Sequence, residues 1–138
     1  LIQEALPGAR VVPVLMTRHD EETCNMLVEA LTKLVGTRPL VVLGSTDLLH
    51  DPSYERVVRE DRKTTSQMCE LDDRGLRARW EPGFQPCCGI GPVTVVLRFA
   101  RQLRTAKGEL LLYRNSGDDF PESRGDYVVG YASIVFRR

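Results

Sequence analysis

The sequence lacks the features that mark several large classes of protein. No apolar run approaches the ~20 residues that a transmembrane helix needs, so we expect no membrane span. The 19 basic residues are balanced by 19 acidic ones, and no basic patch is interleaved with aromatic residues. Nucleic acids and anionic membranes attract clustered positive charge, so we expect neither as a partner.

Several motifs of catalysis are also missing. There is no glycine-rich phosphate loop, no nucleophile elbow and no Cys-x-x-Cys pair. The four cysteines are residues 24, 69, 87 and 88. Two of them lie in helix-like segments and two are adjacent, which does not indicate a secreted disulfide framework. We therefore expect a reducing, cytoplasmic compartment.

The residues that are present indicate a βαβ unit in the first third of the chain. The short β-branched segment 9–16 is typical of a buried strand. Asp20 is a suitable N-cap for a helix whose apolar residues follow helical spacing, and Gly36 suits its end. The apolar run 39–46 is typical of a strand covered on both faces. A strand, a helix and a strand in this order predict parallel pairing with a right-handed crossover.

The rest of the chain adds helices and two late strands. The highly charged segment 53–78 predicts one or two surface helices, with a break near Asp72. A loop rich in proline and glycine follows, and Pro92 suits the first turn of the next helix. Segments 108–116 and 126–136 read as strands joined by a polar turn. In 138 residues this order predicts one α/β domain, a three-layer α/β/α sandwich with a mixed, mostly parallel sheet.

The segment Ser-Thr-Asp-Leu-Leu-His-Asp, residues 45–51, follows the second apolar run directly. Ligands in open α/β sheets collect beyond the carboxyl ends of the strands, so Asp47 and His50 are candidates for a site. A carboxylate can orient an imidazole and raise its basicity, which suits a general acid/base or a metal ligand. The alternative is that Asp47 caps a turn and that His50 is only exposed.

Cys88 is the second candidate. It lies just before a predicted helix, where the positive end of the helix dipole lowers a thiol pKa and favours the thiolate. A thiolate is both a nucleophile and a soft metal ligand. The alternative is a small buried apolar residue, which is our interpretation of Cys24, Cys69 and Cys87.

Two further segments allow weaker hypotheses. His19 lies beside a helix cap, and we interpret it as a surface residue. Residues 113–119, Tyr-Arg-Asn-Ser-Gly-Asp-Asp, have the composition of a turn, although they could also hold a ligand at a strand end.

Four short motifs in one order resemble the Memo-like proteins, also called AmmeMemoRadiSam system protein B. Residues 45–50 are similar to the family's Ser-Ser-Asp-Leu-x-His strand end, with Thr46 in place of the second serine. Residues 88–93 match its Cys-Gly-x-x-Pro-hydrophobic motif. Residues 113–118 match its Tyr-x-x-Ser-Gly-Asp motif, and residues 128–132 match its Val-Val-Gly-Tyr-Ala motif.

The resemblance implies a fold similar to the class III extradiol dioxygenases, which are non-haem iron enzymes. It also implies that residues 1–138 are the C-terminal part of one Memo-like domain whose N-terminal half is absent from this chain. In such a domain Cys88 is a metal ligand together with two N-terminal histidines that do not map to this chain. His50 is then an acid/base oriented by Asp47.

Three functional hypotheses follow. The first is a metal-binding protein, with non-haem iron or copper, that has a redox or oxygenase-like activity on an unknown small molecule. Its remaining ligands come from the absent half, which could be a separate chain. The second is a non-enzymatic scaffold that recognises an anionic or phosphorylated peptide in the same crevice. The third is a metal-free enzyme that uses Cys88 with His50.

Overall fold

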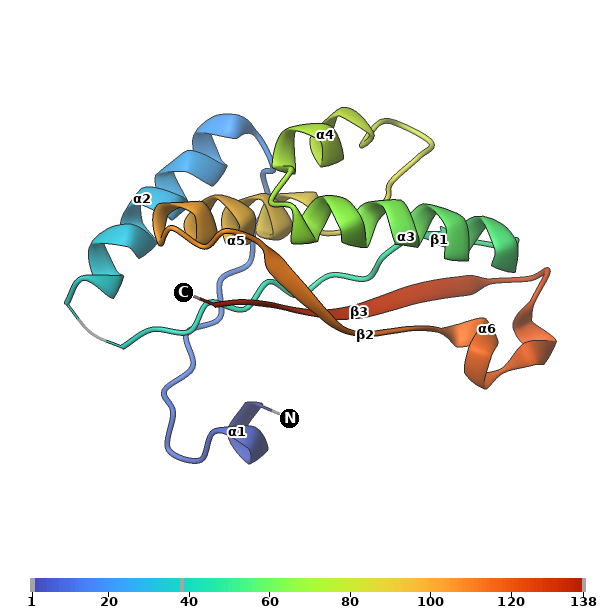
Figure 1. Cartoon of the computed structure of the whole chain (residues 1–138), viewed down its shortest axis with the longest axis horizontal. Coiled ribbons are helices and arrows are strands. Elements are labelled where there is room, and N and C mark those ends of the chain that lie inside the picture. Colours follow the sequence, from blue (N-terminus) through green and yellow to red (C-terminus); the bar gives the residue numbers. More distant parts are fainter. Residues whose placement is uncertain (1, 38, 138) are drawn as a thin grey trace.

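The computed structural model describes residues 2–37 and 39–137. Figure 1 shows that helices α2 to α5 gather on one side of the ribbon formed by β2 and β3, whereas α1 lies on the other side. The helices are α1 (Ile2–Ala5), α2 (Glu21–Val35), α3 (Tyr54–Cys69), α4 (Asp73–Ala78), α5 (Ile90–Gln102), α6 (Ser116–Asp119) and the 3-10 helix η1 (Pro121–Ser123). No helix in these ranges is both long enough and apolar enough to cross a membrane.

The sheet has three strands in the order β1-β3-β2, namely β1 (His50–Asp51), β2 (Gly108–Asn115) and β3 (Val128–Phe136). Both pairings are antiparallel. The predicted α/β class is therefore confirmed, and so are the two late strands. The prediction of a mostly parallel sheet is wrong for the described residues, and a three-layer sandwich is not confirmed.

The two segments that we expected to pair in parallel are extended but form no strand ladder within the described chain. Residues 9–16 and 39–46 carry no strand assignment. Several of their apolar side chains are exposed to solvent: Leu15 is 89% exposed and Val41 is 69% exposed. β-Branched composition favours extended backbone at each residue, but a ladder also needs a neighbouring strand in register, which composition does not specify.

Helices α2, α3 and α4 each begin after a residue whose side chain accepts a hydrogen bond from the first turn. Asp20 accepts a hydrogen bond from the Thr23 N–H at the start of α2, as predicted. The charged segment divides into α3 and α4 at residues 70–72, close to the predicted break. Helix α5 begins at Ile90, two residues before Pro92. Helix α3 is more than a surface helix, because one of its faces is buried against the sheet.

The main core lies between the helices and the sheet. Its largest cluster joins the segment before β1, the helices α3 to α5 and the loop before α5. This cluster contains Leu48, Met68, Leu71, Leu76, Cys87, Ile90, Val93, Leu97 and Ala100. A smaller cluster, Leu49, Val57 and Val128, packs the residue before β1 and the start of β3 against α3. Leu48 and Leu49, the two residues before β1, are therefore anchored by apolar contacts.

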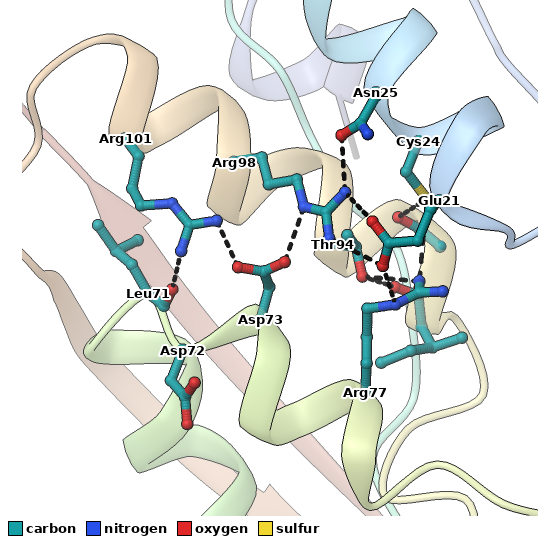
Figure 2. A network of polar contacts seen from close by, with 12 residues as sticks. Glu21, Cys24, Asn25, Leu71, Asp72, Asp73, Arg77, Thr94, Arg98 and Arg101 are labelled. Carbon is teal, nitrogen blue, oxygen red and sulfur yellow. Dashed lines mark hydrogen bonds and ion pairs between the residues drawn. The ribbon is translucent and has the colours of Figure 1, made fainter.

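A network of ion pairs joins α2, α4 and α5, and Figure 2 shows it from close by. Asp73, only 1% exposed, accepts hydrogen bonds from Arg98 and Arg101 of α5. Glu21 at the start of α2 pairs with Arg98 at 2.6 Å and with Arg77 of α4 at 2.9 Å. Burial by itself raises the pKa of Asp73, but the two arginines outweigh it and hold that pKa below its ordinary value. The network therefore fastens the three helices to one another.

Candidate functional site

A crevice of about 300 Å³ opens beside β1. Its walls come from β1, from the first turn of α3 and from the loop that precedes α5. The residues lining it are Leu48, Leu49, His50, Asp51, Arg56, Gly83, Phe84, Gln85 and Cys88. The crevice thus brings together His50 and Cys88, which are far apart in the sequence.

Both ring nitrogens of His50 have polar neighbours. Nδ1 lies 2.8 Å from the Tyr127 hydroxyl, and Nε2 lies 3.5 Å from a carboxylate oxygen of Asp47. The His50 and Tyr127 rings also meet edge to face, with centroids 5.7 Å apart. Antiparallel pairing places His50 opposite Val129, and this register brings Tyr127 within reach. The imidazole is therefore oriented from two sides while its side chain remains accessible to solvent.

The Cys88 sulfur lies against the segment that carries Asp47. The Asp47 N–H donates to Sγ at 3.3 Å, and the Cys88 N–H donates to the Asp47 carbonyl at 3.2 Å. The Thr46 hydroxyl lies 3.4 Å from Sγ and accepts a hydrogen bond from the Gly89 N–H. The sulfur thus has a hydrogen-bond donor from the backbone beside His50. Cys88 is exposed, so its sulfur is available to a ligand.

The other cysteines differ from Cys88. Cys87 and Cys24 are fully buried, and Cys69 is partly buried. Burial raises the pKa of Cys87 to about 12 and also raises the pKa of Cys24 and of Cys69. These three thiols remain protonated near neutral pH, which agrees with their interpretation as small apolar residues.

Arg56 and Phe84 form the outer wall of the crevice. The Arg56 guanidinium forms an ion pair with Asp51 at 2.8 Å and lies 5.8 Å from the centre of the Phe84 ring. Arg79 lies over the same ring at 5.7 Å. These contacts hold the Phe84 ring at the crevice.

The described residues supply one suitable metal ligand rather than a complete metal site. Among residues 2–37 and 39–137, no group of three or more His, Cys, Asp or Glu side chains could hold a metal ion. Catalytic metal sites generally use three protein ligands. The Cys88 sulfur suits one of these positions. His50 suits a proton carrier better than a ligand, because both of its nitrogens already have polar neighbours.

The structure brings Asp47, His50 and Cys88 together, although their chemical roles stay predictions. His19 is partly buried rather than on the surface, because its ring meets Trp80 edge to face with centroids 6.3 Å apart. In the Tyr-Arg-Asn-Ser-Gly-Asp-Asp segment, Asp118 accepts hydrogen bonds from the Asn115 N–H and the Tyr54 hydroxyl. That segment is therefore the end of β2 followed by the short helix α6, which Asp118 helps to cap, and the prediction of a turn is wrong there.

Sequence reasoning missed Tyr127 and Asp61. Tyr127 reaches His50 only through the pairing of β1 with β3, which the sequence did not reveal. Asp61 did leave a signal: it lies four residues after Val57 and seven before Met68, which is the spacing of the buried face of α3. An acidic residue at core spacing is unusual and indicates a specific partner.

Comparison with known proteins places the chain in a family. Residues 1–135 match the family described as Memo-like protein. A MEMO1 family protein of Methanopyrus kandleri is 37% identical over 133 residues, which cover 94% of this chain and 46% of that relative. A relative of the same description from Pyrobaculum aerophilum is 32% identical over 139 residues, 99% of this chain and 49% of the relative.

A MEMO1 family protein of Methanosarcina mazei is 30% identical over 128 residues, which cover 91% of this chain and 47% of that relative. The chain thus spans about half the length of the curated relatives that it matches. No solved structure matches it. The family match covers nearly all of the chain, and the four motifs noted in the sequence fall within it. The chain therefore belongs to the Memo-like protein family.

Proposed function

We propose that this chain forms one side of a metal-binding site with redox or oxygenase-like activity. Cys88 is the thiolate ligand for iron or copper, and His50, oriented by Asp47, is the acid/base. The observation that carries this proposal is the crevice that Cys88 and His50 line together. Its substrate is an unidentified small molecule or peptide.

The roles of the chain's own residues follow from their contacts. The Asp47 N–H stabilises negative charge on the Cys88 sulfur. The Tyr127 hydroxyl and the Asp47 carboxylate fix the orientation of the His50 ring, so that the ring can hold or release a proton at the crevice. Iron or copper, when bound, supplies one-electron redox chemistry.

The remaining ligands must come from a histidine-bearing segment outside this chain. We propose that this segment corresponds to the half of the relatives that the chain does not match, either as a separate chain or on the same polypeptide. Several apolar side chains of residues 9–16 and 39–46 are exposed to solvent. They support such a partner, because contiguous exposed apolar surface commonly marks an interface. Val12 is 81% exposed and Leu43 is 64% exposed.

The test is metal analysis of the protein purified with the polypeptide that accompanies it. We expect iron or copper in near-equimolar amount and a histidine-bearing partner in the mass spectrum. Cys88→Ala should lose most of the metal, whereas Cys69→Ala, at a partly buried cysteine outside the crevice, should retain it. Unchanged metal in Cys88→Ala would refute the proposal.

A second candidate function is recognition of an anionic or phosphorylated peptide without chemistry. Two observations favour it: Arg56 lines the crevice, and α5 begins without a side-chain cap, which leaves N–H groups at its first turn. The pairing of Arg56 with Asp51 weakens this case. A phosphopeptide that binds the metal-free protein, and binds Arg56→Ala more weakly, would favour this function.

The metal-free cysteine enzyme has less support. The hydrogen-bonding neighbours of the Cys88 sulfur among the described residues are Thr46 and Asp47, and His50 is not one of them. A cytoplasmic location stays a prediction that rests on the four cysteines.

A further inference from the structure

Asp61 is a buried carboxylate beneath the crevice. It belongs to α3 and is 0% exposed. One oxygen, Oδ1, accepts a hydrogen bond from the Leu49 N–H at 3.1 Å, and the other, Oδ2, accepts from the Tyr113 hydroxyl at 2.9 Å. The Asn115 amide donates in turn to that hydroxyl at 3.5 Å. Asp61 thus connects α3, β2 and the backbone next to His50.

The fold leaves room for this carboxylate at Gly130. A Cβ atom at Gly130 would lie 1.8 Å from Oδ2 of Asp61, so no other residue fits there without displacing the carboxylate. The Gly130 backbone also accepts from the Leu48 N–H and donates to the Leu49 carbonyl. The two bonds to Gly130 hold residues 48 and 49 on one side, and the Asp61 carboxylate holds the Leu49 N–H on the other.

The anchored residue lies between the two functional groups. Leu49 directly precedes His50. Asp47, two residues before Leu49, donates its N–H to the Cys88 sulfur. A backbone N–H as deeply buried as that of Leu49 requires an acceptor, and Asp61 supplies it. We propose that Asp61 is a positioning residue that holds the segment 47–50, and through it His50 and the donor to Cys88, in the geometry of the site. This inference rests on the proposed function.

The protonation state of this carboxylate decides one of its two side-chain hydrogen bonds. Burial raises the pKa of Asp61 to about 6, against the opposing effects of the Leu49 N–H, the Tyr113 hydroxyl, His50 of β1 and Arg79 at the end of α4. Below that pH the protonated carboxyl can still accept from the Leu49 N–H through one oxygen, whereas its other oxygen becomes a donor to the Tyr113 hydroxyl, which must then direct its own proton elsewhere. Protonation should therefore change the bond to Tyr113 and leave the bond to Leu49 in place.

The test uses NMR and thiol alkylation on the full chain at pH 7.5. In Asp61→Ala the Leu49 N–H loses its acceptor. We expect loss of the nuclear Overhauser contacts between the His50 and Tyr127 rings and alkylation of Cys88 slowed about fivefold, the scale of one lost hydrogen bond. Asp61→Asn, whose amide oxygen can still accept from Leu49, should restore both readouts to within twofold.

The matched control is Asp73→Asn. It alters the other buried carboxylate, which lines no wall of the crevice, and should leave both readouts unchanged at a temperature where it is folded. If Asp61→Ala keeps both readouts, or if Asp73→Asn changes them equally, the proposal is overturned.

A milder variant keeps the test decisive if Asp61→Ala does not fold. The Leu49 amide shift should titrate with a midpoint near pH 6 in the wild type, reporting Asp61. Tyr113→Phe removes a donor to the carboxylate, so the midpoint should move to higher pH; an unmoved midpoint contradicts the proposal.

None of these readouts uses a metal. A metal-free protein would refute the proposed function alone, and unchanged readouts would refute the role of Asp61 alone.

Discussion

Two buried aspartates in this chain have opposite electrostatic surroundings. Asp61 and Asp73 are 0% and 1% exposed. Asp61 receives hydrogen bonds from neutral donors, and burial raises its pKa to about 6. Asp73 contacts two guanidinium groups, which hold its pKa below the ordinary value despite burial. Adjacent counter-charge, rather than depth, decides the protonation state of a buried carboxylate.

The difference separates a structural role from a role beside the site. The Asp73 network joins α2, α4 and α5 and depends on full ionisation (Figure 2). Asp61 is held by donors that an amide could also satisfy, and its charge is not balanced by a direct ion pair among the described residues. Four experiments test this difference and the site beside it.

The largest effect should come from Asp73→Ala. Removal of the carboxylate leaves Arg98 and Arg101 facing each other without their shared partner, and breaking a buried pair in this way costs about 3–5 kcal/mol. Urea unfolding at pH 7 measures the loss. Asp61→Asn is the comparison variant and should lose no stability at this pH, because the amide avoids the cost of burying the Asp61 charge. Equal losses in the two variants would contradict the distinction.

The second effect is the pH dependence of stability. A folded-state pKa raised from 3.8 to about 6 means that the folded protein binds the Asp61 proton more tightly. Asp61 therefore contributes stability below pH ~4 that is lost as pH rises to ~6, by at most about 3 kcal/mol. Asp73 has the opposite sign, because its pKa is lowered: its contribution is present above pH ~4 and is lost as pH falls. Between pH 4 and 6, the free energy of unfolding of Asp61→Asn should lack the change with pH that Asp61 causes. If it changes with pH as steeply as in the wild type, that change does not come from Asp61.

The third effect concerns Gly130→Ala. The added methyl group meets the Asp61 carboxylate, and such overpacking costs about 1–3 kcal/mol. Gly36→Ala is the control, since its added Cβ would lie 3.6 Å from the Lys33 carbonyl oxygen, an ordinary contact. Chemical denaturation of both variants measures the difference. If the two variants are equally stable, the Asp61 carboxylate moves aside without a cost in free energy.

The smallest effect should come from Thr46→Val. The Thr46 hydroxyl donates to the Asp47 carbonyl and accepts from the Gly89 N–H, both at 2.8 Å. Its loss should cost about 1–2 kcal/mol and should change the alkylation rate of Cys88. The exposed Thr37→Val, which loses one hydrogen bond to Leu34 at the end of α2, should cost less and should not affect Cys88.

Local signals predicted most of the elements but not the sheet. Caps such as Asp20 and the apolar spacing of α2 and α5 act within a few residues, and the structure has both helices there. The direction of strand pairing depends on segments far away in the sequence. Residues 9–16 and 39–46 have strand composition without a neighbour in register in the described chain, so composition alone misled the prediction of a parallel sheet.

The candidate site was partly predictable for the same reason. Asp47 and His50 follow an apolar run, and Cys88 precedes a helix, so local rules identify all three residues. Tyr127 and Asp61 act on them through the pairing of β1 with β3 and the packing of α3. Those contacts need the register and the orientation of a helix, which a single sequence does not provide.

The central claim is that Cys88 is a metal ligand at the crevice that it shares with His50. Iron and copper content of the protein, isolated with its accompanying polypeptide, tests this most directly when wild type and Cys88→Ala are compared. The account predicts near-equimolar metal in the wild type and little in Cys88→Ala. Equal metal in both proteins, or none in the wild type with its histidine-bearing partner present, would contradict it.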